Sequence, residues 1–187
     1  MNYKDLILDI GLERYKHSLR VMDTALELGK IYKTNLENIK IASIYHDCGK
    51  IGSTEEVLKI TDRRNIKLSK EDLKSPEVVH TILGRYLAEH KYNIKDEDIL
   101  NAIEFHTTGR PKMSLLEKII YIADYTEPNR DFSGVEKVRE ASKKDIDNSM
   151  ILALKNTIDY LKSKDIHIHK NTLDAYNYFI EIKGVII

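Results

Sequence analysis

Apolar residues recur at spacings of three and four along most of this chain, which is the period of one face of an α-helix. The stretch 12–31 shows the pattern clearly, with Leu12, Tyr15, Leu19 and Met22 on one face. Only three prolines interrupt the 187 residues, so few positions forbid a helix. The sequence therefore predicts an all-α fold. Helices are expected over 12–31, 35–47, 75–90, 96–106, 114–125, 134–144, 148–163 and 172–182.

Local signals indicate where several of these helices begin and end. Ser75 followed by Pro76 predicts an N-cap and a proline at the first helical position. Gly49 and Pro128 are expected to end the helices that precede them. The basic stretch 59–74 has acidic residues interspersed, and we expect it to form a solvated loop.

A chain of this length can bury a substantial core without disulfides. We expect one domain over residues 1–187, with a core over about 12–145 and C-terminal helices over about 148–182 packed on that core. The alternating run 166–169 is the one candidate for a short strand.

Composition excludes several classes of partner. The 30 basic and 30 acidic residues balance, so we expect no nucleic-acid partner and no attraction to an anionic membrane. No run approaches the roughly 20 apolar residues of a membrane span. The single cysteine, Cys48, fits a reducing cytoplasm and is expected to be a small buried side chain. Ile186 and Ile187 fit a homodimer interface and a frayed end equally well.

Several histidines and aspartates occupy inward or terminal positions of the expected helices. Asp124 continues the stripe of Leu116 and Ile120, and His106 extends the stripe of Ile103. For one histidine alone, a hydrogen-bonded core imidazole is the simpler explanation, and Asp124 could cap a turn. The joint pattern on separate helices instead predicts a metal site at the centre of a bundle. Its candidate ligands are His17, His46, Asp47, His80, His106 and Asp124.

The order His, His-Asp, Asp on helices resembles the HD superfamily of metal-dependent phosphohydrolases. Lys50 follows the His46-Asp47 pair as in the common form of that motif, and two extra histidines match the subset with a fuller, often dinuclear, site. The runs 105–111 and 121–131 resemble one bacterial group more specifically. That group is the HD-type symmetrical bis(5′-nucleosyl)-tetraphosphatases, iron-dependent enzymes that split diadenosine tetraphosphate into two ADP.

The resemblance extends from about His17 to Asn177, nearly the whole chain. Ser133 and Lys170 stand where the family tends to have proline, which affects only loop details. The resemblance implies one or two iron ions, although the ligand types also admit manganese, cobalt or zinc. It implies a first metal on His17, His46, Asp47 and Asp124, while His80 and His106 either complete a second metal or contact phosphate directly.

The resemblance also implies roles for side chains around the metal. Asp47 and Lys50 are the expected catalytic residues, with Lys50 neutralising charge on the phosphates. Any of the cations could equally be an ordinary surface residue, and the start of the last helix a plain N-cap. The expected substrate-binding residues are Lys50, His80, His106, Arg110, Arg130 and Thr172.

Three other functions fit parts of this pattern. One is another HD phosphohydrolase that acts on nucleotides, and a second is a nucleotide or metal sensor without turnover. The third is a helical interaction domain whose histidines are incidental. Neither a nucleophile-elbow serine nor a Gly-rich phosphate loop is present, so nucleotide binding would depend on the metal cluster and on side chains.

Overall fold

The computed structural model of the protein describes residues 3–184, and every regular element in that range is a helix. The prediction of an all-α fold is therefore confirmed. The elements are α1 (Lys4–Ile10), α2 (Leu12–Ile31), α3 (Leu36–Tyr45), α4 (Thr54–Arg63), α5 (Lys70–Lys74), a 3₁₀ turn η1 (Pro76–Val78), α6 (Val79–His90), α7 (Glu97–Phe105), α8 (Leu115–Thr126), α9 (Val135–Ser142), α10 (Ile146–Ser163) and α11 (Lys170–Lys183).

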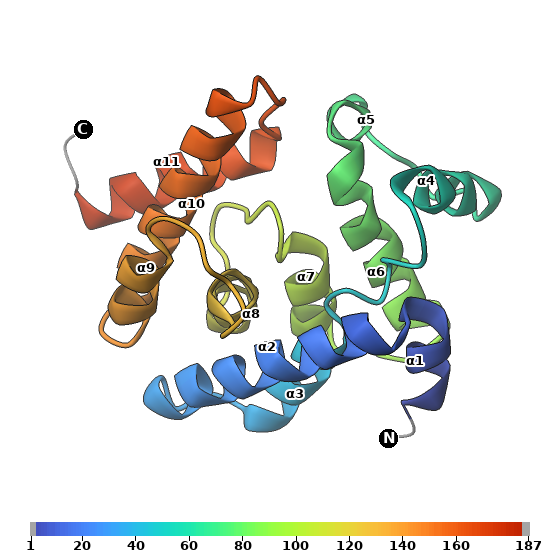
Figure 1. Cartoon of the computed structure of the whole chain (residues 1–187), viewed down its shortest axis with the longest axis horizontal. Helices are drawn as coiled ribbons and strands as arrows, with labels where there is room; N and C mark the ends of the chain where they lie inside the picture. Colours follow the sequence, from blue (N-terminus) through green and yellow to red (C-terminus); the bar gives the residue numbers. More distant parts are fainter. Residues whose placement is uncertain (1–2, 185–187) are drawn as a thin grey trace.

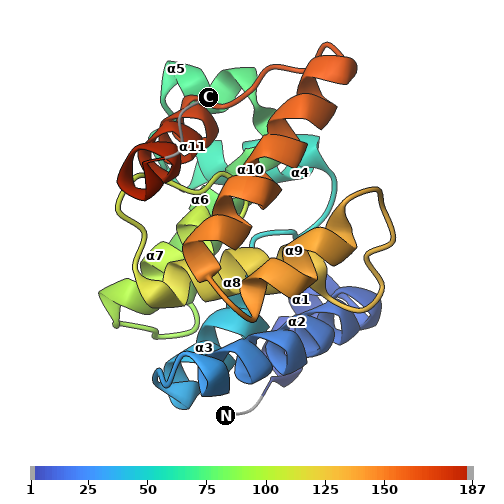
Figure 2. The same cartoon turned by 90° about the vertical axis from the view of Figure 1, so that its left-hand side faces the viewer.

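Helix α8 lies at the centre of the molecule. It packs against α2, α3, α7, α9 and α10, and Figure 1 shows it end-on with the other helices around it. Helix α10 crosses it from the side of α9 and α11 (Figure 2). Ile119, Ile120, Ile122 and Ala123 are all fully buried, because a helix surrounded on every side can be apolar all round. Asp124 extends this apolar run, so the fold carries a carboxylate into its interior.

The prediction of a loop over 59–74 was wrong, because α4 and α5 cover much of it. Ser53 and Glu56 form a capping box at the start of α4, and Ser69 and Asp72 form another at the start of α5. The basic side chains are solvated on the outer faces of these helices, while Val57 is buried against the core. Helix α1, with Leu6 buried, was not predicted.

Two local predictions also need correction. The side chain of Ser75 makes no capping hydrogen bond, and the segment after it opens as the 3₁₀ turn η1 with Pro76 at its first position. Residues 166–169 form no strand. Instead, His169 accepts a hydrogen bond from the backbone N–H of Asn171 and caps α11, which begins at Lys170.

No helix within residues 3–184 combines the length and the apolar character that crossing a membrane requires. The predicted interface at Ile186 and Ile187 lies outside the described residues.

The turn after α3 lies directly against α6. A Cβ atom on Gly49 would be 2.0 Å from the carbonyl oxygen of His80 and 2.5 Å from the backbone nitrogen of Gly84. The thiol of Cys48 is buried and donates a hydrogen bond to the carbonyl of Gly84 at 3.2 Å, as expected for a small interior side chain. Gly49 therefore permits the close backbone contact that sets the His46-Asp47 pair beside His80.

We predict that Gly49→Ala lowers the free energy of unfolding by about 3 kcal/mol, because neither neighbouring backbone atom can move without displacing α6. Urea unfolding followed by circular dichroism measures the change. Gly84→Ala is the matched control, since its Cβ would meet nothing closer than 3.3 Å. Equal, small effects of the two substitutions would contradict the close-contact explanation.

Candidate metal centre

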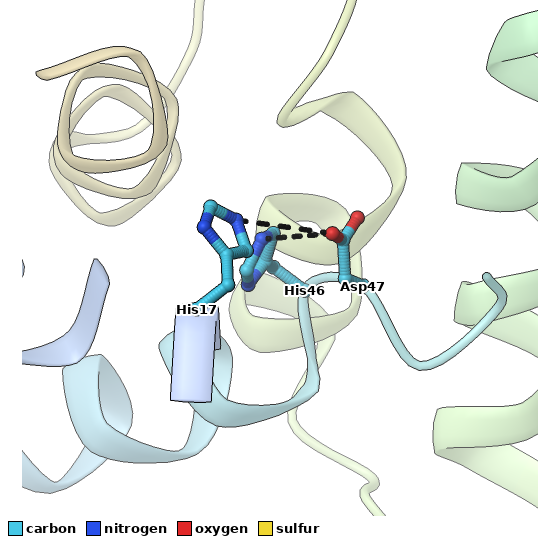
Figure 3. A group of neighbouring side chains, drawn as sticks. All are labelled: His17, His46 and Asp47. Carbon is cyan, nitrogen blue, oxygen red and sulfur yellow. Dashed lines mark ion pairs between the residues drawn. The ribbon is translucent and has the colours of Figure 1, made fainter. Parts of the chain in front are cut away.

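The six predicted metal ligands come together from five segments of the chain. His17 comes from α2, and His46 and Asp47 follow the last residue of α3. His80 lies in the first turn of α6, His106 directly follows α7, and Asp124 lies in α8. Figure 3 shows the rings of His17 and His46 directed at the carboxylate of Asp47. His46 and Asp47 therefore lie just past the end of a helix, where adjacent side chains can converge on one point.

The two oxygens of Asp47 face different ligands. Oδ2 lies 3.5 Å from His46 Nε2 and 3.9 Å from His17 Nε2. Oδ1 lies 3.5 Å from His80 Nε2 and 3.4 Å from His106 Nε2. One buried carboxylate therefore stands between two pairs of imidazoles, with an oxygen directed at each pair. Asp124 joins the first pair, its Oδ1 being 3.0 Å from His17 Nε2 and 3.9 Å from His46 Nε2.

Three of the histidines are oriented by the same local hydrogen bond. In each, Nδ1 lies 2.7 or 2.8 Å from the carbonyl oxygen three residues earlier: Ser43 for His46, Glu77 for His80 and Ile103 for His106. A carbonyl only accepts, so Nδ1 carries the proton and Nε2 presents a lone pair to the cluster. In metal sites, a hydrogen bond from the other ring nitrogen orients a ligating histidine in this way.

Polar atoms at the middle of the cluster lack the partners that burial normally demands. Nε2 of His17, Nε2 of His46 and Oδ1 of Asp47 are buried and make no hydrogen bond. Leaving such groups unpaired is costly, particularly for a carboxylate. Divalent cations on the two sides of Asp47 would satisfy these atoms. Ligand atoms from His17, His46 and Asp47, and from Asp47, His80 and His106, lie within 4.8 Å of one another, which suits coordination of one ion by each set.

The electrostatics of the cluster favour the protonation states that bind metals. Burial lowers the pKa of His46 to about 4, although the nearby aspartates oppose the shift. Burial, with Lys50 and His106, lowers the pKa of His80 to about 3. Burial raises the pKa of Asp47, but His46, His106 and Lys50 outweigh it and hold the pKa well below its usual range. His46 and His80 are therefore neutral and Asp47 is ionised at neutral pH.

Three cations border the cluster and line a cavity of about 470 Å³ that opens from it. Lys50 Nζ is 3.2 Å from Asp47 Oδ1, and Arg130 Nη2 donates to Asp124 Oδ1 at 2.6 Å. Arg14, which sequence reasoning missed, donates from Nη1 to Asp47 Oδ2 at 3.1 Å. Its position three residues before His17 on α2 was the available signal, since residues at that spacing share a helix face.

Glu127 is a second residue that sequence reasoning missed. Its buried carboxylate has Oε1 at 3.5 Å from His17 Nδ1, and its Oε2 accepts a hydrogen bond from Arg20 Nε at 2.8 Å. Glu127 therefore lies beside Nδ1 of His17, where the other three cluster histidines have a backbone carbonyl. It lies three residues beyond Asp124, inside the run already singled out, but its direction toward α2 depends on tertiary packing.

Two predicted substrate-binding residues are not brought to the cluster. Arg110 makes a bidentate ion pair with the buried carboxylate of Glu117, with both N···O distances 2.7 Å, and lies over the ring of Phe105. Thr172 is buried in the first turn of α11 and lines neither cavity that borders the cluster. The substrate-binding roles given to these two residues stay predictions.

Comparison with known proteins agrees with this geometry. A family model described as HD domain matches residues 14–129. A protein of Halalkalibacterium halodurans named "Bis(5'-nucleosyl)-tetraphosphatase, symmetrical" is 44% identical over 89% of each chain, and a protein of Bacillus subtilis with the same name is 40% identical over 89% of each chain. A crystal structure from Clostridium acetobutylicum, described as a "predicted HD superfamily hydrolase involved in NAD metabolism", superposes with a TM-score of 0.91 at 44% identity, covering 97% of this chain and 98% of that one.

The matched segment contains all six cluster residues, of which Asp124 is half-buried and the other five are buried. The chain therefore belongs to the HD-domain family and, within it, to the family of metal-dependent hydrolases whose curated members are the symmetrical bis(5′-nucleosyl)-tetraphosphatases.

Proposed function

We propose that this protein hydrolyses dinucleoside tetraphosphates symmetrically and converts diadenosine tetraphosphate into two ADP. The observation that carries the proposal is the cluster around Asp47, two of whose members, His80 and Asp124, line a cavity together with Lys50, Arg14 and Arg130. A polyphosphate needs both a Lewis acid and side-chain cations along its length. Relatives that align over most of their length carry the name of this activity.

We propose that this cluster would hold two ions. His17, His46, Asp47 and Asp124 would hold one ion, and Asp47, His80 and His106 would hold the other. Iron fits the mixture of imidazole and carboxylate ligands, as manganese, cobalt and zinc do. When bound, the metal supplies Lewis acidity: it lowers the pKa of water and polarises a phosphoryl oxygen.

The chain's own cations would bind and orient the phosphates. Lys50 offers three N–H donors and each arginine five, so each can hold its carboxylate and still bind a phosphate oxygen. In the overall reaction, a water oxygen forms a bond to one of the two central phosphorus atoms. The bond between that phosphorus and the central bridging oxygen breaks, so that one ADP keeps the water oxygen and the other leaves with the bridging oxygen. The two protons of the water pass to solvent as the new terminal phosphates ionise.

The cysteine content bears on where the protein is located. The single buried thiol of Cys48 fits a reducing compartment, which supports a cytoplasmic location.

The description of the Clostridium acetobutylicum protein makes NAD⁺ a useful comparison substrate. A sensor without turnover would bind nucleotide and release no product.

We predict that a divalent metal stabilises the protein against heat. At a free concentration 100 times its Kd, the metal adds about 2.7 kcal/mol. For a chain of this size the melting temperature then rises by about 5–10 °C. Differential scanning calorimetry with manganese, before and after chelation, measures the shift.

His46→Ala should reduce this shift, because it removes a ligand from one of the two sets. His90→Ala is the matched control, since His90 is an exposed histidine that lies outside the cluster. A shift of unreduced size in His46→Ala would contradict the assignment of the metal centre.

We predict that anaerobic incubation of the iron-loaded protein with diadenosine tetraphosphate yields ADP alone, as resolved by anion exchange. ATP together with AMP would mean asymmetric cleavage. Absence of product, with metal still bound, would favour another nucleotide substrate or the sensor.

Lys50→Ala should keep the metal and lower kcat by about 10²-fold, because a cation beside the reacting phosphate is lost. Metal analysis and steady-state kinetics separate the two quantities. Unchanged kcat would remove Lys50 from the catalytic machinery.

A further inference from the structure

Exposed aromatic side chains are rare on this protein and gather in one place. Of the phenylalanine and tyrosine residues between 3 and 184, only Phe132, at 41% relative exposure, and Tyr160, at 59%, are exposed. Phe132 belongs to the loop that joins α8 to α9, and Tyr160 to the C-terminal half of α10. Both line one cavity of about 590 Å³. Exposed rings that converge on a cavity indicate a binding site more often than chance exposure does.

This aromatic cavity, which Tyr125, Phe132 and Tyr160 form, shares wall residues with the cavities beside the metal centre. Tyr125, Phe132 and Arg130 also line a smaller cavity of about 250 Å³, whose wall includes the cluster residues His106 and Asp124. Arg130 also borders the polar cavity that His80 and Asp124 line. Because Arg130 lines all three cavities, a ligand whose phosphate binds Arg130 lies at the edge of the aromatic cavity.

The lining of the aromatic cavity suits a flat, polar-edged ring. The rings of Tyr125 and Phe132 meet edge to face with centroids 5.0 Å apart, which holds the Phe132 ring in one orientation. Asn156 and Thr157 supply amide and hydroxyl groups on the α10 side of the cavity. Aromatic faces stack on any nucleobase, and amide groups can hydrogen-bond to its edge.

We infer that the aromatic cavity holds one nucleobase of the dinucleotide, stacked against Phe132 and Tyr160, while its phosphates lie at Arg130 and the metal centre. The inference rests on the proposed function, because it takes the ligand to be a nucleoside polyphosphate. It identifies the part of the chain that distinguishes a nucleotide from an inorganic polyphosphate.

Isothermal titration of ADP and of inorganic pyrophosphate into the manganese-loaded protein tests the inference, since only ADP carries a base. Base stacking on an aromatic side chain contributes about 1–3 kcal/mol, so Phe132→Ala and Tyr160→Ala should each raise the Kd of ADP about tenfold. The Kd of pyrophosphate should not change. Tyr160→Phe keeps the ring and should bind ADP like the unmodified protein.

Leu8→Ala is the control, because Leu8, at 82% relative exposure, is an exposed apolar residue on α1 that does not line the cavity. An unchanged Kd for ADP in both alanine variants would overturn the nucleobase subsite, as would an equal weakening of ADP and pyrophosphate. Hydrolysis of diadenosine tetraphosphate by the unmodified protein is measured separately. If ADP binding depends on the two rings but diadenosine tetraphosphate is not hydrolysed, the proposed function is refuted and the nucleobase subsite stands. If diadenosine tetraphosphate is hydrolysed but ADP binding does not depend on the rings, the nucleobase subsite is refuted and the proposed function stands.

Discussion

The arrangement of the helices depends on one buried carboxylate. Asp47 is 1% exposed and lies among four imidazoles, a lysine and an arginine. An ionised carboxylate without such surroundings would cost several kcal/mol to bury. Lys50 and Arg14 compensate the charge of Asp47, while the histidines present Nε2 lone pairs to the cluster. Helices α2, α6, α7 and α8 each bring a side chain to this cluster beside the end of α3, and Gly49 is pressed against α6 where they meet. Asp124, the second carboxylate, is paired with Arg130.

Helix ends perform two tasks at this centre. The last carbonyls of a helix have no partner within it. Ser43 lies in the last turn of α3 and Ile103 in the last turn of α7, and their carbonyls accept the Nδ1–H of His46 and His106. Each hydrogen bond therefore satisfies a helix terminus and also turns Nε2 toward the cluster. Ligand orientation is thus built into the secondary structure, before any metal binds.

The sequence predicted the parts of this centre that helical periodicity controls. His106 and Asp124 each extend an apolar stripe, so their inward direction follows from spacing alone. The basic segment was misjudged because its charge was given more weight than its capping residues, although Ser53 with Glu56 was readable as a helix start. Arg14 was missed although its spacing from His17 on one helix face was readable, whereas Glu127 could not be assigned, because its direction depends on which helices pack together. The same holds for Phe132, a loop residue whose cavity exists only where the α8–α9 loop meets α10.

Backbone carbonyls orient three of the cluster histidines for metal binding. Proton–nitrogen correlation spectra of the metal-free protein at neutral pH, with ¹⁵N-labelled histidine, report the tautomer of each ring directly. We predict neutral rings protonated at Nδ1 for His46 and His80, with Nε2 unprotonated, as their carbonyl contacts and lowered pKa values require. Rings protonated at Nε2, or charged imidazolium at these two positions, would contradict the claim.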